Sequence, residues 1–228
     1  MYLIAKIRLS LLNVPNNIVL QDVIKNPVIK GTYQAVFCQP PFGLKFDKYY
    51  YDYLNSIKSS FLPLSARTSS EWLFIDQVCK SLAPNGKAVL VVSANLLSKQ
   101  TDAPFRRALL EKKMVEGVIV LPDGILEPYT SLKTAMLILS KKENDQVILY
   151  DYNSSHSRKD IFDADQLLQE YVDAESVDAL QCIESGLNPT SVLGSKAIDD
   201  IDTPTELETV VEGLYPSSQM ISTKFGKY

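Results

Sequence analysis

The sequence predicts an α/β fold: a mainly parallel sheet with helices on both faces and an antiparallel edge. Residues 88–92 are apolar without alternation, which is typical of a parallel strand that helices cover on both sides. Segments with helical spacing of apolar residues lie between the expected strands. The strands expected between 115 and 150 leave no room for long helices, so we expect them to form the antiparallel edge.

Composition places the chain among globular proteins. Of 228 residues, 46% are hydrophobic and 22% are charged. No apolar run approaches the ~18 residues that span a membrane, and no signal-peptide pattern begins the chain. Three widely separated cysteines argue against a zinc site or a disulfide framework. We therefore expect no membrane partner, no metal and a cytoplasmic location.

Charge divides the chain into two segments. Residues 1–150 carry 18 lysines and arginines against 12 acidic residues, whereas residues 151–228 carry 5 against 15. We expect residues 1–150 to form the α/β core, whose basic balance suits a phosphate-bearing partner. Residues 151–228 are expected to form an acidic, partly helical tail that meets protein or solvent.

The expected elements follow from apolar spacing and from breaker residues. A helix is expected at 2–12, so the chain opens within an α/β alternation and with no strand before that helix. Thr68 and Glu71 have the spacing of a capping box that opens a helix. The remaining expectations are strands at 18–20, 35–38, 88–92, 115–121, 134–139 and 147–150, a turn at 84–86, helices at 105–113, 163–172 and 175–184, and an irregular stretch at 190–228.

The segment that carries chemistry is 35–43, Ala-Val-Phe-Cys-Gln-Pro-Pro-Phe-Gly. An apolar strand stops there at Gln39, because Pro40 and Pro41 cannot donate to a sheet ladder. Open α/β sheets bind ligands at the carboxyl ends of their strands. The alternative is a loop that ends a strand and has no further role.

Gln39-Pro40-Pro41-Phe42 resembles the Asn/Asp-Pro-Pro-Tyr/Phe motif of adenine-N6 DNA methyltransferases, in particular the modification subunit of type I restriction-modification systems. The segments 71–92 and 105–140 resemble the family's next units in the same order, and the resemblance covers roughly residues 5–170. It implies a Rossmann-like, S-adenosylmethionine-dependent methyltransferase sheet in a bacterium or archaeon.

The resemblance also implies roles for these residues. Such enzymes flip the target base out of the duplex, and Phe42 would stack on it. The Pro40 carbonyl and the Gln39 side chain would accept the N–H bonds of the adenine amine, with S-adenosylmethionine as methyl donor. Asp22 resembles the acidic residue that binds the amino group of the cofactor's adenine, and its alternative role is a turn cap.

Two departures from the family pattern bear on activity. Gln39 keeps the amide chemistry, but its extra methylene shifts the amide, and a ~1 Å misplacement can cost ~10²-fold in rate. The nine glycines include no Gly-x-Gly, so the family's glycine-rich cofactor loop is not recognisable. We expect the chain to begin after that loop and its two strands. The 35–38 strand would then form an open apolar edge, covered by another polypeptide or by residues 18–20.

Lys45, Lys48 and Tyr49 are weaker candidates for DNA contacts, because aromatic side chains among lysines suit bases and phosphates. The favoured alternative is an ordinary surface helix.

Two hypotheses of function follow. The first is a carboxyl-terminal part of an adenine-N6 DNA methyltransferase, inactive or weak alone and completed by an upstream fragment. Its partners would be DNA and the specificity and restriction subunits. The second is a non-catalytic remnant that serves as a DNA- or subunit-binding module. Gln39 and the missing loop favour the second for the isolated chain, and the ordered motifs favour the first.

Overall fold

The computed structural model describes residues 2–26, 31–44, 61–64, 68–156 and 160–193. In chain order these form α1 (Tyr2–Leu11), β1 (Tyr33–Cys38), α3 (Ser70–Ser81), β2 (Leu82–Ser93), two short 3-10 turns (Ala94–Leu97 and Gln100–Asp102), α4 (Ala103–Glu111), β3 (Val115–Val120), β4 (Thr134–Ser140), β5 (Gln146–Asp151), α5 (Tyr152–Ser155), α6 (Ala164–Asp173), β6 (Ser176–Asp178) and α7 (Ala179–Ser185). The structure confirms the expected helices at 2–12, 105–113 and 163–172 to within a few residues. It also confirms the expected strands between residues 35 and 150, although β2 begins earlier than expected, at Leu82.

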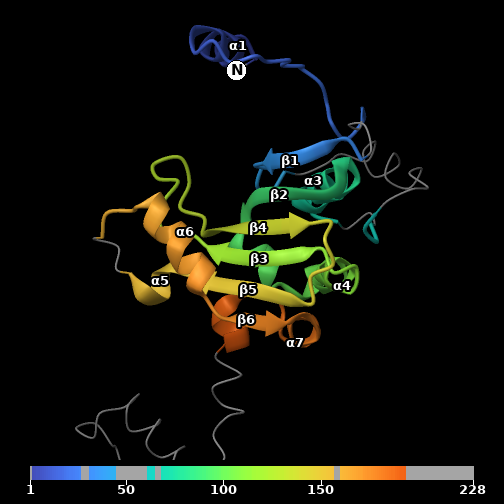
Figure 1. Cartoon of the computed structure of the whole chain (residues 1–228), viewed down its shortest axis with the longest axis vertical. Helices are drawn as coiled ribbons and strands as arrows, with labels where there is room; N and C mark the ends of the chain where they lie inside the picture. Colours follow the sequence, from blue (N-terminus) through green and yellow to red (C-terminus); the bar gives the residue numbers. More distant parts are fainter. Residues whose placement is uncertain (1, 27–30, 45–60, 65–67, 157–159, 194–228) are drawn as a thin grey trace, which may run out of the picture.

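One six-stranded sheet has the order β1-β2-β4-β3-β5-β6 (Figure 1). The pairs β1–β2 and β3–β5 are parallel, and the other three pairs are antiparallel. Four strands, β1, β2, β3 and β5, therefore run in one direction, which confirms the mainly parallel sheet. The edge strand β6 is antiparallel, so the sheet has the expected antiparallel edge, but β4 is antiparallel too and lies inside the sheet, between β2 and β3. None of the residues of β4 is exposed, which suits an interior position.

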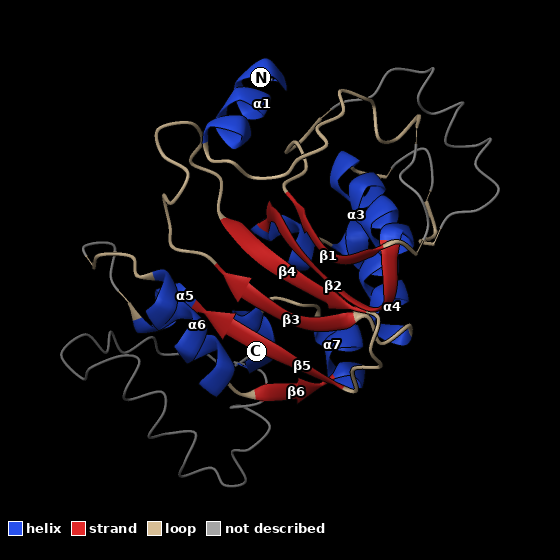
Figure 2. Cartoon of the chain, turned by 45° about the horizontal axis from the view of Figure 1, so that its top comes forward, coloured by secondary structure: helices blue, strands red, loops and turns tan. Residues whose placement is uncertain are grey.

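Helices cover both faces of the sheet, as expected (Figure 2). The larger apolar cluster joins one sheet face to α3, α4 and α7, and the Trp72 and Phe105 rings stack in it with centroids 5.1 Å apart. The smaller cluster joins the other face to α5 and α6 through Ile119, Leu167 and Tyr171. The α6 helix crosses β3 and β5, so β1 and β2 have no described helix over that face (Figure 1).

One local expectation is wrong. Residues 18–20 form no strand and do not pair with the free edge of β1 in the described sheet, and Val19 and Leu20 are exposed. The turn expected at 84–86 is present as an irregularity within β2, where Asn85 has a φ of +60° and the backbone of Gly86 lies against that of Ala83. Tyr33 pairs with Leu82 and Ala35 pairs with Lys87, so β2 has extra residues opposite β1.

The segment after residue 150 contributes to the sheet. The helix expected at 175–184 begins only at Ala179, because residues 176–178 form β6 and pair with β5. Cys182 and Val192 are buried in the larger cluster. The domain boundary after 150 stays a prediction, and the end of the expected tail, 194–228, lies outside the described residues.

The amino-terminal helix stands apart from the sheet (Figure 1). None of the residues of α1 is buried, and its apolar side chains Leu3, Ile7 and Leu11 are exposed. Within the described residues, none of the helices has the length and apolar character needed to cross a membrane.

A buried carboxylate on α3 fixes the segment 61–64. Asp76 Oδ1 accepts hydrogen bonds from the Phe61 and Leu62 amides at 2.6 and 2.8 Å, and its Oδ2 lies 2.6 Å from Lys80 Nζ. The Asp76 side chain is fully buried. Removal of one partner from such a cluster leaves uncompensated buried polar groups.

We expect Asp76→Ala to lower the free energy of unfolding by about 3–4 kcal/mol, measured by urea denaturation. Asp76→Asn keeps the acceptor for both amides and should lose less. As a control, the exposed Glu111 at the end of α4 should tolerate alanine within ~0.5 kcal/mol. Equal stabilities of Asp76→Ala and the wild type would contradict this assignment.

Candidate target-base site

The candidate site lies where the codirectional strands end. Because β1, β2, β3 and β5 run in one direction, their carboxyl ends share one edge of the sheet. β1 ends at Cys38, as the two prolines predict. In the turn that follows, Gln39 and Pro41 are exposed, Pro40 is buried and Phe42 is half-buried. Gly43 leaves the turn at φ +60°, a conformation that favours glycine.

The first turn of α3 supports this segment. Ser70 Oγ donates a hydrogen bond to the Pro41 carbonyl at 3.3 Å. Ser70 is only 1% exposed, whereas Pro41 is exposed, so this bond is partly buried. The hydroxyl therefore connects the start of α3 directly to the turn.

The next residue of α3 holds the end of the neighbouring strand. Glu71 Oε1 accepts from the Ser93 amide at 2.8 Å, and Glu71 Oε2 accepts from Ser93 Oγ at 3.2 Å. The capping box expected from Thr68 and Glu71 is therefore wrong: this carboxylate bonds Ser93, and Ser69 precedes the helix without a side-chain cap. Cys38 pairs with Leu90, so Pro41 and Ser93 lie equally far along their strands.

Buried charges surround Glu71. Burial raises the pKa of Glu71, the Ser93 hydrogen bonds oppose this, and the negative charge of Asp102 adds to it. Burial also raises the pKa of Asp102, against the effect of the Lys99 and Arg106 charges. The Arg106 guanidinium is buried too and donates to the Leu96 and Lys99 carbonyls at 2.9 and 2.8 Å. Arg106 is thus structural.

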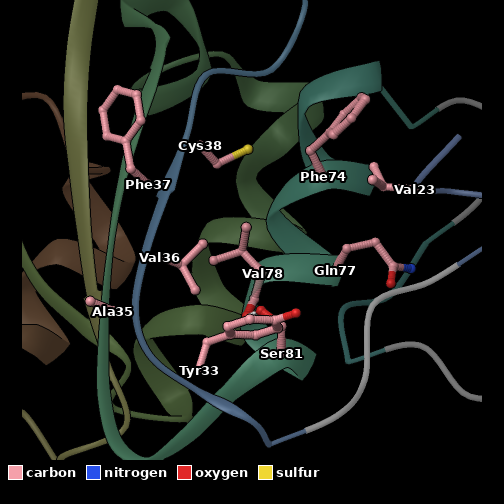
Figure 3. Close-up of a pocket in the computed structure, with 10 residues that line it drawn as sticks. All are labelled: Val23, Tyr33, Ala35, Val36, Phe37, Cys38, Phe74, Gln77, Val78 and Ser81. Carbon is pink, nitrogen blue, oxygen red and sulfur yellow. Dashed lines mark hydrogen bonds between the residues drawn. The ribbon is translucent and has the colours of Figure 1, made fainter. Parts of the chain in front are cut away.

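A cavity of about 340 Å³ lies beside the strand that leads to the turn, between β1 and α3 (Figure 3). Val36 and Cys38 point from β1 toward α3, where Phe74 and Val78 face them (Figure 3). The Gln77 side chain is 7% exposed, and its Oε1 has no hydrogen-bond partner within the described part of the chain. The cavity is therefore lined mainly by apolar side chains, Tyr33, Gln77 and Ser81 are the polar ones, and the turn itself is not part of its lining.

The other sequence candidates are placed as follows. Asp22 Oδ1 accepts from the Ile24 and Lys25 amides at 3.0 and 3.2 Å, which is the geometry of the turn-cap alternative. Its contact with a cofactor stays a prediction. Lys45, Lys48 and Tyr49 lie outside the described residues. Among the residues that the structure describes, no group of three or more His, Cys, Asp or Glu could hold a metal.

The described residues do not form a cradle for S-adenosylmethionine. That cofactor carries a charged amino-acid part, a ribose and an adenine, which need several polar partners at close range. The cavity beside β1 is lined mostly by apolar side chains. The Asp22 carboxylate is already bonded to two amides of its own turn.

Sequence reasoning located the turn but missed its support. Pro41 and Ser70 are 29 residues apart, Glu71 and Ser93 are 22 apart, and no local pattern relates the members of either pair. In the sequence, Glu71 has the spacing of a capping box with Thr68, and this local pattern does not indicate a contact with Ser93.

Comparisons with known proteins agree on one family. The family described as N-6 DNA Methylase matches residues 1–182. The methylase subunit of the type I restriction enzyme EcoEI from Escherichia coli is 23% identical over 145 residues, which are 62% of this chain and 28% of that protein.

Solved structures show the same fold. A type I restriction-modification methyltransferase subunit from Streptococcus thermophilus superposes with a TM-score of 0.70 at 21% identity, over 83% of this chain and 45% of that one. A putative class I S-adenosylmethionine-dependent methyltransferase from Listeria monocytogenes superposes with a TM-score of 0.55 at 20% identity, over 73% of this chain and 50% of that one. This chain thus spans half the length of these proteins or less.

The buried Glu71 predicts a pH dependence of stability. Because its pKa is raised in the folded chain, the folded state holds the proton more tightly than the unfolded state does. Its contribution to stability is therefore full below the ordinary value of 4.5 and is lost as pH rises through the raised pKa. Glu71→Gln keeps an acceptor for the Ser93 amide and cannot ionise, so its stability relative to the wild type should improve as pH rises.

Urea denaturation between pH 4.5 and 7.5 measures this difference. Glu111→Gln, at an exposed site, should follow the wild type at every pH. Parallel curves for the wild type and Glu71→Gln would show that Glu71 has an ordinary pKa.

Proposed function

Because the chain belongs to the N-6 DNA Methylase family, we propose that it supplies the target-adenine side of a type I DNA adenine-N6 methyltransferase. The observation that carries the proposal is the position of Gln39-Pro40-Pro41-Phe42. This turn stands at the carboxyl edge of the sheet and is bonded to the start of α3. A polar side chain, a proline carbonyl and an aromatic ring are thereby presented together.

In this proposal the turn binds a flipped adenine. Phe42 is half-buried, so one part of its ring is held while another can stack on a base. The Gln39 amide oxygen and the Pro40 carbonyl accept the two N–H bonds of the exocyclic amine. Acceptance of both bonds favours a lone pair localised on nitrogen, which is the electron pair that must attack a methyl group.

The methyl group would come from S-adenosylmethionine, the donor that the family resemblance implies. We assign the cradle of that cofactor to residues outside the described part or to another polypeptide, because the described residues do not form it. Asp22 remains a proposed contact with the cofactor's adenine, since a carboxylate can accept more than the two hydrogen bonds from its turn.

The proposed partners are DNA, the specificity and restriction subunits, and a polypeptide that completes the sheet. β1 is an edge strand and exposes Phe37 to 70%. An apolar edge strand with unpaired backbone groups favours addition of a further strand. Lys45, Lys48 and Tyr49 are proposed contacts with DNA.

A second candidate function is a non-catalytic binding module. The longer Gln39 side chain favours it, because a misplaced amide can cost ~10²-fold in rate. Such a module would keep the sheet, its edge and its partners but would not methylate DNA.

Phe42→Ala tests the enzymatic proposal in the organism that encodes the chain. Single-molecule sequencing of its DNA should show N6-methyladenine at one sequence motif, and the variant should lose at least ~90% of it because the stacking platform is gone, at ~1–3 kcal/mol per base. Gln39→Asn should retain or increase the methylated fraction.

Phe162→Ala serves as the control, since this exposed phenylalanine packs edge-on against Tyr152, far from the turn in sequence. It should leave methylation unchanged. Methylation that persists in Phe42→Ala would overturn the enzymatic proposal in favour of the binding module.

The exposed edge predicts self-association of the purified chain. A lysine on an edge strand opposes pairing with another chain, so Phe37→Lys should shift the light-scattering mass toward the monomer. Leu180→Lys is the matched control, because Leu180 is 72% exposed on α7 and lies away from β1. A monomeric wild type at ~100 μM would mean that the edge is already covered.

A further inference from the structure

We propose that Ser70 and Glu71 are positioning residues that hold the Gln39–Phe42 turn in register with the end of β2. This inference rests on the proposed function for its catalytic consequence, but its structural part can be tested alone. Both side chains are buried, at 1% and 5% exposure, at the start of α3.

The turn needs support from a side chain because of its prolines. Pro40 and Pro41 have no amide proton, so the ladder between β1 and β2 cannot continue past Cys38. What the turn offers is carbonyl groups, and these require donors. Within the described residues, the Ser70 hydroxyl supplies such a donor, to the Pro41 carbonyl at 3.3 Å.

Ser70 also restrains the neighbouring Pro40 carbonyl. The Pro41 ring fixes one backbone dihedral angle, and the hydrogen bond to its carbonyl restrains the next. The contact with Ser70 thereby restrains the orientation of the peptide plane between the two prolines, which carries the Pro40 carbonyl. In the proposed function, the Pro40 carbonyl accepts a hydrogen bond from the target amine. Loss of the Ser70 contact would then let this carbonyl adopt a wider range of orientations.

Glu71 fixes the second strand end to the same helix turn. Its two oxygens engage the Ser93 amide and hydroxyl at 2.8 and 3.2 Å. A buried carboxylate is unfavourable unless it is well bonded, and Asp102 raises the penalty here. A purely apolar packing role would not require this charge. The carboxylate is placed where it joins β2 to α3 beside the Ser70 contact.

The two contacts together form one clamp. Ser70 holds Pro41 beyond β1, and Glu71 holds Ser93 at the end of β2. Since Cys38 pairs with Leu90, each of these two anchor residues comes three positions after the last pair of β1 and β2. The clamp thus replaces the strand pairing that the prolines interrupt.

Hydrogen exchange of the purified full chain, followed by mass spectrometry or NMR, tests the clamp. Ser70→Ala should speed exchange of the Gln39, Phe42 and Gly43 amides by roughly fivefold to tenfold, the equivalent of one lost hydrogen bond. Glu71→Ala should affect the same amides and that of Ser93. Glu71→Gln should behave like the wild type, because its amide can accept from the Ser93 N–H and donate to its hydroxyl.

Ser81→Ala is the matched control. Ser81 is equally buried at the other end of α3, and its hydroxyl donates within the helix to the Val78 carbonyl at 2.9 Å. It should lower stability without changing exchange at the turn. If Ser70→Ala, which should still fold, leaves turn exchange at the wild-type rate, the clamp does not exist.

Methylation in the encoding organism separates this inference from the proposed function. Where Phe42→Ala removes methylation, Ser70→Ala and Glu71→Ala should reduce it at least severalfold, and Glu71→Gln should restore it. Full methylation in both alanine variants would overturn the positioning role. Faster turn exchange in a chain whose wild type supports no methylation would confirm the clamp and reject the proposed function.

Discussion

The site depends on one constraint: two consecutive prolines at the end of an edge strand. They cannot donate to the ladder, so β1 must stop at Cys38 and its last segment must be held from another direction. The start of α3 provides this hold through Ser70, and Glu71 holds the end of β2 beside it. Packing of α3 against the sheet, through Trp72 and its neighbours, therefore determines where the turn stands.

The sequence was a good guide to local structure. Apolar spacing predicted α3, α4 and most strands, because helical and strand periods depend on near neighbours. It did not predict that β4 lies between β2 and β3, because pairing joins residues far apart in the chain. It also failed at residues 18–20, where a short apolar run has strand character but does not pair with the free edge of β1 in the described sheet.

The same distinction applies to the site. Gln39-Pro40-Pro41-Phe42 could be found because its residues are contiguous and its prolines have a known effect on a strand. The contacts from Ser70 and Glu71 could not, because Pro41 and Ser70 are 29 residues apart and Glu71 and Ser93 are 22 apart. Asp22 shows that a local pattern can also leave two roles open. Its sequence context fits both a cofactor contact and a turn cap, and the structure shows the geometry of the cap.

The edge position of β1 connects assembly to chemistry. Within the described residues, β1 is paired with β2 on one side only, and beside it lies a mainly apolar cavity lined in part by Gln77, whose side-chain oxygen has no described partner. A strand added to the free side would pair the remaining backbone groups of β1 and further order the residues that lead into the turn. The α3 clamp and the proposed partner would then act on opposite sides of the same short strand. Under the proposed function, binding of the partner and placement of the acceptors for adenine are therefore coupled through β1. The coupling matters for the rate, because an acceptor misplaced by ~1 Å can lower it ~10²-fold.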